Sequence, residues 1–231
     1  MNDSELGFLG KRVVHPLRLK ALRILAPNRL CQGNPFRQIW VDPGRISSTL
    51  PRGVLERSDH HAPIRKGRFC KFNAIGFVEG GDWDKRVKPY NPRKGSLFAA
   101  LEQRYTQNIP WEKTEFHAAM LEIVAQGATC WNGARSAADI AARCARADRL
   151  MESIRAHGFQ ENAHPVVICI GADGALIKAG NGQHRIMLGL ITGAKIPVLP
   201  VVRHRDWEAI RTWKSPESAR HSDHPDMLPR E

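Results

Sequence analysis

The residues in this chain best suited to chemistry stand together in one short stretch, Gly180-Asn181-Gly182-Gln183-His184-Arg185. The stretch is rich in glycine, and His184 and Arg185 fall in the first turn of a helix expected to continue over residues 186–192. Free backbone N–H groups, the positive end of a helix dipole and a fixed guanidinium all favour a bound anion. We therefore predict an anion-binding turn at residues 180–185.

Short apolar segments on both sides of this turn predict the elements that would hold it in place. Residues 166–170 and 175–179 are typical of two short strands joined by the turn Ala172-Asp173-Gly174. The helix that follows the anion-binding turn ends at Gly193, and Ile196-Pro197-Val198 begins another strand. The order strand, strand, turn, helix, strand predicts a mixed α/β unit around the site.

Two further helices are predicted upstream. Ser136 is a suitable N-cap, with Asp139 completing part of a capping box, for a helix that ends at Gly158. Thr114 is the N-cap of an earlier helix that ends at Gly127. Apolar residues recur at helical spacing in the longer of the two: Ile140, Cys144, Ala147, Met151 and Ile154.

Strand and turn patterns fill the first half of the chain, whereas the end of the chain lacks any periodicity. A strand over 38–41 is closed by Asp42-Pro43-Gly44, and a second strand falls within 69–78. The run Gly80-Gly81-Asp82-Trp83-Asp84 interrupts it. After Trp213 the chain is rich in Pro, Ser, His and charge, so we predict a disordered tail.

The charge balance of the chain favours anionic partners. The 231 residues are enough for one domain with a substantial core, and 42% of them are hydrophobic. Lys and Arg number 35 against 23 Asp and Glu, a net charge of +12. Nucleotide phosphates, nucleic acid and an acidic membrane surface all fit this excess.

Cysteine use and hydropathy favour a cytoplasmic location. The five cysteines are widely spaced and form no C-x-x-C pair, which argues against a disulfide framework and a structural zinc site. No stretch approaches the length of a membrane span, and no secretion signal is evident. Basic and apolar residues alternate within segment 11–29. The segment therefore fits either an amphipathic segment on a membrane or an acidic partner, or an ordinary surface helix.

Several short motifs in a fixed order resemble the ParB/sulfiredoxin superfamily. Residues 38–50 are similar to the first strand and turn of that superfamily, and residues 148–202 to its later part. The motifs that carry the later resemblance are Leu150–Phe159, Pro165–Ile168, Asp173-Gly174, Gly182–Arg185, and Gly193 with Ile196-Pro197-Val198. The residues between the two parts look like the insertion of a little-characterised ParB-like group.

The resemblance implies an α/β (α+β) fold with a small mixed sheet. The ParB/sulfiredoxin-like domain would span residues 36–213 and carry a helical insertion over 56–145. A basic N-terminal extension over 1–35 would precede it, and the disordered tail over 214–231 would follow it.

The resemblance also implies a nucleotide ligand, since the turn binds ATP in sulfiredoxins and in a free-serine kinase, and CTP in ParB partition proteins. Gly182 would let the backbone approach the phosphates, and His184 and Arg185 would bind their oxygens. Sulfiredoxins have a cysteine where this chain has Gln183, so reduction of a sulfinic acid is not expected. The full set of implied phosphate-binding residues is Gly180, Gly182, Gln183, His184 and Arg185.

Catalysis would need a carboxylate near this turn. Asp82 and Asp84 flank Trp83 and could bind Mg²⁺ or act as a general base in phosphoryl transfer, or they could simply form the turn. The paired histidines His60-His61 and His221-x-x-His224 lack a third ligand at a recognisable spacing, so we predict no metal site from them.

Three functions from different classes follow. The first is a nucleotide-binding phosphotransferase or NTPase that uses ATP or CTP with Mg²⁺, and it requires a carboxylate within reach of Arg185. The second is a DNA- or RNA-associated ParB-like module that catalyses nothing, and it requires arginines gathered on one face. The third is a peripheral membrane protein recruited through residues 11–29.

Overall fold

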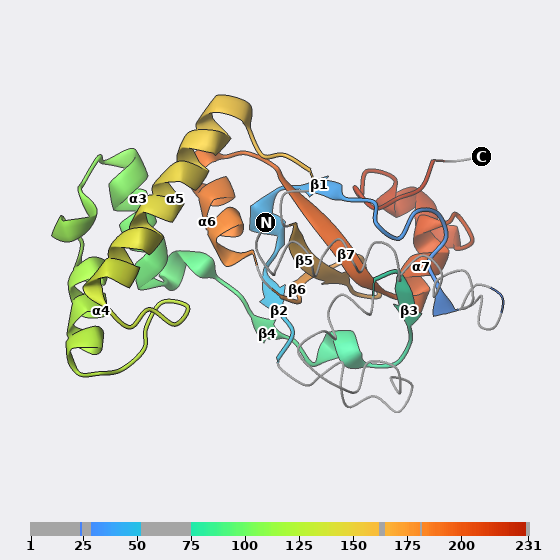
Figure 1. Ribbon diagram of the computed structural model, residues 1–231. Helices are drawn as coiled ribbons and strands as arrows, with labels where there is room; N and C mark the ends of the chain where they lie inside the picture. Colours follow the sequence, from blue (N-terminus) through green and yellow to red (C-terminus); the bar gives the residue numbers. More distant parts are fainter. Residues whose placement is uncertain (1–23, 25–28, 52–74, 162–164, 181, 230–231) are drawn as a thin grey trace.

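The fold is built on one mixed sheet of seven strands (Figure 1). The computed structural model describes residues 24, 29–51, 75–161, 165–180 and 182–229. The strand order is β1-β7-β5-β6-β2-β4, and β3 also pairs with β7. The strands are β1 (Ile39–Val41), β2 (Ser48–Thr49), β3 (Phe77–Glu79), β4 (Lys88–Pro89), β5 (Val166–Ile170), β6 (Leu176–Lys178) and β7 (Ile196–His204). Helices and a mixed sheet together confirm the predicted α/β (α+β) class.

The α-helices gather mainly on one side of this sheet (Figure 1). They are α3 (Ser96–Thr106), α4 (Glu115–Ala125), α5 (Ala137–His157), α6 (Gln183–Thr192) and α7 (Arg205–Arg211). The described chain also contains short 3₁₀ turns: Pro43–Arg45, Trp83–Lys85, Pro92–Lys94, Trp111–Lys113 and Pro216–His221. Helices α3 to α6 lie at the end of the sheet away from α7, so α5 and α6 are neighbours although 25 residues and two strands separate them.

β7 is the centre of the sheet, since it pairs with three strands. It runs parallel to β5 and β3 and antiparallel to β1. β1 pairs with the first residues of β7 and β3 with its last ones, so the two short strands share one edge of the long one. Every residue of β5 and β7 is buried, as continuous apolar runs predict for strands covered on both faces.

Two hydrophobic clusters cover the two faces of the sheet. Ile168 of β5 packs with Met151 of α5 and Ile186 of α6, whereas the next residue, Cys169, packs with Trp83 on the other face. Side chains alternate between faces along a strand, so β5 joins both clusters. β5, which lies against Gly182 at the start of α6, is therefore packed on both of its faces.

The predicted helix caps are confirmed. The Ser136 hydroxyl accepts a hydrogen bond of 3.1 Å from the Asp139 N–H at the start of α5. The Thr114 hydroxyl accepts one of 3.2 Å from the His117 N–H at the start of α4. Gly158 ends α5 with a φ of +69°, a conformation that favours glycine.

The stretch predicted as a helical insertion, residues 56–145, also contributes strands to the sheet. Within it β3 pairs with β7, and β4 pairs with β2. These strands are two and three residues long, too short to show the alternation by which a strand is recognised in sequence. Among the described residues of this stretch, the first α-helix begins at Ser96.

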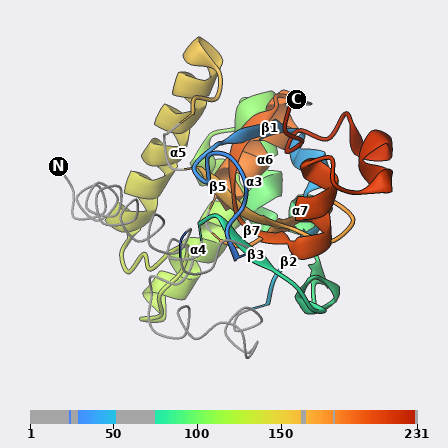
Figure 2. The same cartoon turned by 90° about the vertical axis from the view of Figure 1, so that its right-hand side faces the viewer.

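The structure corrects the prediction of a disordered tail after Trp213. Residues 216–221 form a 3₁₀ turn, and the segment packs beside α7 (Figure 2). The Asp226 carboxylate is fully buried and accepts two hydrogen bonds, of 2.8 and 2.7 Å, from the Arg203 guanidinium in β7. Asp226 also forms an ion pair of 3.1 Å with the buried Arg211 of α7, so buried charges fasten a segment whose composition alone indicates disorder.

Other predictions fall partly outside the described residues. Most of the basic extension 1–35, including nearly all of the amphipathic stretch 11–29, lies there, as do His60, His61 and Cys70. The other four cysteines are buried and form no disulfide. Within the described part of the chain, no helix is both long and apolar enough to cross a membrane.

Candidate functional site

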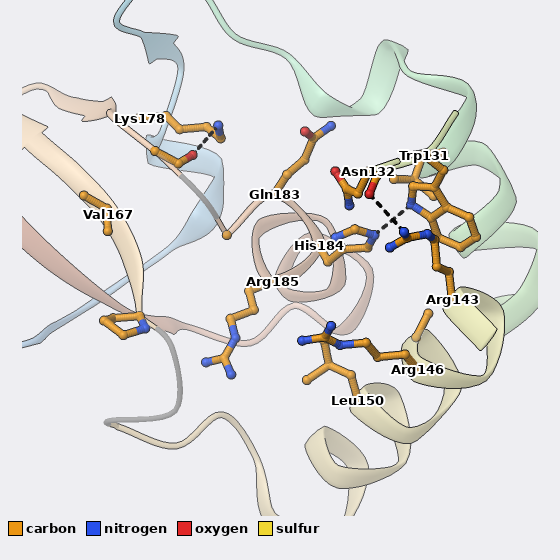
Figure 3. A pocket seen from close by; sticks show the side chains of 15 residues that line it. Trp131, Asn132, Arg143, Arg146, Leu150, Val167, Lys178, Gln183, His184 and Arg185 are labelled. Atoms are coloured by element: carbon orange, nitrogen blue, oxygen red, sulfur yellow. Dashed lines mark hydrogen bonds between the residues drawn. The ribbon is translucent and has the colours of Figure 1, made fainter. Parts of the chain in front are cut away.

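A pocket of about 690 Å³ opens at the N-terminal end of α6 (Figure 3). α5 forms one wall, the end of the β5–β6 hairpin forms another, and the turn around Trp131 and Asn132 closes the side. A volume of several hundred Å³ suits a nucleotide-sized ligand. All five residues predicted to bind phosphate line it: Gly180, Gly182, Gln183, His184 and Arg185.

Gly182 connects the pocket to the core. Its φ is +110°, and a Cβ at this position would lie 2.8 Å from Cγ2 and 2.9 Å from Cα of Val166 in β5. Glycine is therefore required here by a positive φ and by contact with a strand. The resemblance had assigned Gly182 to close approach of a ligand, whereas the structure gives it a packing role.

α6 begins directly after this glycine with its first N–H groups open. Among the described residues no side chain caps the helix, and the first bond of its ladder runs from the Ile186 N–H to the Gly182 carbonyl. The N–H groups of the first turn of a helix have no partner within the helix. They point out of the helix end, where the pocket lies.

Lys178 braces the turn from β6. Its ammonium donates a hydrogen bond of 2.7 Å to the Gly180 carbonyl and lies 5.5 Å from the centre of the Tyr90 ring. Burial raises the pKa of Tyr90 to about 12, so this phenol stays neutral. Lys178 thus adds a positive charge to the pocket wall, and its hydrogen bond fixes the Gly180 carbonyl.

Two arginines from different helices face the same space (Figure 3). Arg185 of α6 is half-buried and Arg146 of α5 is exposed, and both line the pocket. Among the described residues, neither guanidinium forms a hydrogen bond or an ion pair. Burial lowers the pKa of Arg185, because a charged group loses solvent there. Two guanidiniums without counter-charges would bind an anion strongly.

Arg143, one turn before Arg146, has a different role. Its guanidinium donates a hydrogen bond of 2.9 Å to the Asn132 carbonyl, which ties the turn at residues 131–133 to α5. Its Nε is buried and has no hydrogen-bond partner. Arg143 thus adds positive charge to the pocket and also fixes one of its walls.

His184 is held by Trp131. The indole N–H of Trp131 donates to Nε2 of His184 at 3.3 Å, and the two rings lie with their centres 6.1 Å apart (Figure 3). Burial, and to a lesser degree the charge of Arg146, lowers the pKa of His184. The imidazole is therefore neutral at neutral pH.

Acidic residues are missing from the described lining of this pocket. Asp148 of α5 is directed instead to the other helices, where it accepts hydrogen bonds of 3.1 to 3.2 Å from Arg104, Tyr105 and Trp111. All the charged side chains that line the pocket, among the described residues, are therefore lysine or arginine.

Asp82 and Asp84, predicted as catalytic, do not lie in this pocket. The Asp84 carboxylate accepts a hydrogen bond of 2.8 Å from the Ala172 N–H, at the end of the β5–β6 hairpin away from Gly182. Asp82 forms an exposed ion pair of 2.7 Å with Lys85, whose hydrogen bond and charge lower the pKa of Asp82. Asp82 thus pairs within its own turn, whereas Asp84 links its turn to the turn of the β5–β6 hairpin.

The two histidines of the tail pack against an aromatic ring. The rings of His221 and His224 pack edge-on against Trp207, with centres 5.5 and 4.3 Å away. No group of three metal-ligating side chains occurs in the part of the chain that the structure describes.

Sequence reasoning found the glycine turn but not its partners. Arg146 stands in a helix with several other arginines, and nothing in its spacing distinguishes it from them. Trp131 carries a weak indication, since it is an aromatic residue followed by Asn-Gly in a turn.

No family model, no curated protein and no solved structure matches this chain.

Proposed function

We propose that this protein binds a nucleotide, ATP or CTP, by its phosphates in the pocket at the start of α6. The observation that carries the proposal is the pair of guanidiniums of Arg146 and Arg185, which face one space beside the N-terminus of α6 and have no partner among the residues that the structure describes. The resemblance of the Gly182–Arg185 turn to ParB/sulfiredoxin nucleotide turns agrees with it.

The three kinds of donor complement one another. Backbone N–H groups at a helix start bind phosphate oxygens, and the helix dipole adds favourable charge. Each guanidinium offers two parallel N–H groups that match two phosphate oxygens. With no carboxylate on the described walls, the phosphates meet no repulsion there.

For catalysis, the pocket supplies positioning and charge. Arg146 and Arg185 would neutralise negative charge that develops on a transferred phosphoryl group. The described lining supplies neither a carboxylate base nor a carboxylate ligand for Mg²⁺, so we propose no step through either. Nucleotide binding is the function that these residues support directly.

The test is nucleotide affinity measured by calorimetry for the wild type and three variants. Arg146→Ala and Arg185→Ala should each weaken ATP or CTP binding by about tenfold to a hundredfold, because each removes charged hydrogen bonds. Arg149→Ala is the matched control: this exposed arginine stands on α5 outside the pocket lining, so its removal should change affinity by no more than about twofold.

Two results would contradict the proposal. One is a wild type that binds neither ATP nor CTP, with or without Mg²⁺. The other is an equal loss of affinity in all three variants, which would indicate a general charge effect. A third result would favour the nucleic-acid module instead: an affinity for a random DNA duplex that decreases steeply with salt concentration and does not change in Arg185→Ala.

A further inference from the structure

The turn that carries Trp131 has an unusual backbone. Trp131, Asn132 and Gly133 have successive φ values of +27°, +61° and +86°. Residues with a Cβ rarely adopt this left-handed region, and they do so where the surrounding structure compels them. A bulky tryptophan in this conformation indicates that its direction matters.

Several contacts compel this conformation. Cys130 and Ala134 exchange backbone hydrogen bonds of 3.0 and 2.7 Å across the turn. Arg143 binds the Asn132 carbonyl from α5. The Trp131 ring packs edge-on against Phe116, with ring centres 5.1 Å apart, and contacts Trp111 at 6.1 Å. The indole is therefore held from three sides and cannot swing away from α6.

The held indole determines where the proton of His184 resides. An indole N–H is a donor only, so Nε2 of His184 must accept from it with a lone pair. In a neutral imidazole the remaining nitrogen, Nδ1, then carries the hydrogen. Among the described residues, Nδ1 has no hydrogen-bond partner, and His184 lines the pocket.

We propose that Trp131 is a positioning residue for phosphate recognition, which holds His184 as the Nδ1–H tautomer and so presents one neutral N–H donor to a phosphate oxygen. This inference rests on the proposed nucleotide site. It adds a directional neutral donor to the charged donors of Arg146 and Arg185. Such a donor supplies one hydrogen bond in a fixed direction and adds no charge.

The tautomer can be measured without a ligand. Two-bond ¹H–¹⁵N NMR spectra of the full chain distinguish Nδ1–H from Nε2–H imidazoles, and the spectrum of His184→Gln identifies the resonances of His184. We expect Nδ1–H in the wild type and a shift toward Nε2–H in Trp131→Phe. Trp213→Phe is the control, since its N–H binds the Leu228 carbonyl, away from the pocket. An Nε2–H tautomer in the wild type would overturn the inference.

The second measurement is ATP affinity as a function of pH. The charged groups that face His184 across the pocket are Arg143 and Arg146 of α5, Lys178 of β6 and Arg185 of its own helix. At about pH 7.5, Trp131→Phe should bind ATP about tenfold more weakly than the wild type. The deficit should shrink as the pH falls below the lowered pKa of His184, because an imidazolium donates from both nitrogens.

The outcomes separate the two proposals. Equal ATP affinity in the wild type and Trp131→Phe at every pH would overturn the positioning role and leave the nucleotide site standing. A wild type that binds no nucleotide would refute the site, and the NMR spectra would still decide whether Trp131 sets the tautomer. If Trp131→Phe fails to fold, benzothienylalanine at position 131 keeps the ring shape and removes only the N–H.

Discussion

At Gly182 the proposed phosphate-binding turn and the hydrophobic core meet in one residue. A Cβ at this position would lie 2.8 Å from Cγ2 of Val166 in β5, and Gly182 is the N-cap of α6. The positive φ of Gly182 turns the chain so that the N–H groups of α6 open into the pocket. The same residue therefore determines both the stability of the strand–helix packing and the geometry of the proposed phosphate contacts.

Gly182→Ala should lower the free energy of unfolding by about 3 kcal/mol, since it combines left-handed strain with a clash against a strand. Gly193→Ala is the matched control, because Gly193 also has a positive φ, +69°, but no atom within 4 Å of a Cβ placed there. It should cost about 1 kcal/mol. Urea unfolding followed by circular dichroism measures both, and equal losses would contradict the role given to Val166.

The site could be predicted from the sequence only where its residues are contiguous. Gly180 to Arg185 are consecutive, so their shared pattern was visible. Arg146 and Trp131 reach the pocket through the packing of α5 and of a hairpin turn against α6, which no local pattern encodes. Asp82 and Asp84 do not line this pocket, and the sequence could not indicate this, because suitable residue types carry no information on which end of a hairpin they reach.

At the scale of elements, β7 depends on the segment that follows α7. Arg203 lies fully buried near the end of β7, and Asp226 supplies its counter-charge. The Asp226 carboxylate also accepts a hydrogen bond of 2.9 Å from the Trp207 indole in α7. Strand, helix and tail thus meet at a single carboxylate.

Asp226→Asn should destabilise the protein by about 3 to 5 kcal/mol, because it leaves the Arg203 guanidinium buried without a full counter-charge. Asp223→Asn makes the same chemical change at an exposed position of the same segment and should stay within about 0.5 kcal/mol of the wild type. Guanidinium chloride titrations give both values. A loss below about 1 kcal/mol for Asp226→Asn would show that the ion pair does not hold the tail.

Elements with a clear period or cap were predictable, and those defined by distant partners were not. The caps at Thr114 and Ser136 lie within three residues of the N–H groups they bind, so the sequence contains both halves. β3 and β4 are strands only because β7 and β2 pair with them. The tail is ordered by a carboxylate 23 residues from its arginine, a separation without a sequence pattern.

At the scale of the whole molecule, His224 links stability to pH. Its Nε2 donates a hydrogen bond of 3.1 Å to the Gly174 carbonyl, and its Nδ1 accepts one of 3.2 Å from the Asp226 N–H. A second proton would have to bind at Nδ1 and would break the latter bond. Burial lowers the pKa of His224 from 6.5 to about 4.

The free energy of unfolding should therefore fall as the pH decreases from about 6.5 to about 4. In this window the unfolded chain binds a proton at His224 that the folded chain excludes, so acid favours unfolding, by up to about 3 kcal/mol. His184, whose pKa burial also lowers, adds in the same direction. Chemical denaturation at a series of pH values measures the slope. His224→Gln should flatten it, and an unchanged slope in that variant would contradict the assignment.

The closure of β7 by Asp226 also has a consequence for the order of events in a cell. Translation proceeds from the N-terminus, so Arg203 is synthesised 23 residues before the carboxylate that neutralises it. Until Asp226 emerges, burial of the end of β7 would place the Arg203 guanidinium in the core without this counter-charge. We therefore expect this end of the sheet to stay hydrated in the nascent chain. Its burial would follow only after the segment that contains Asp226 has been synthesised.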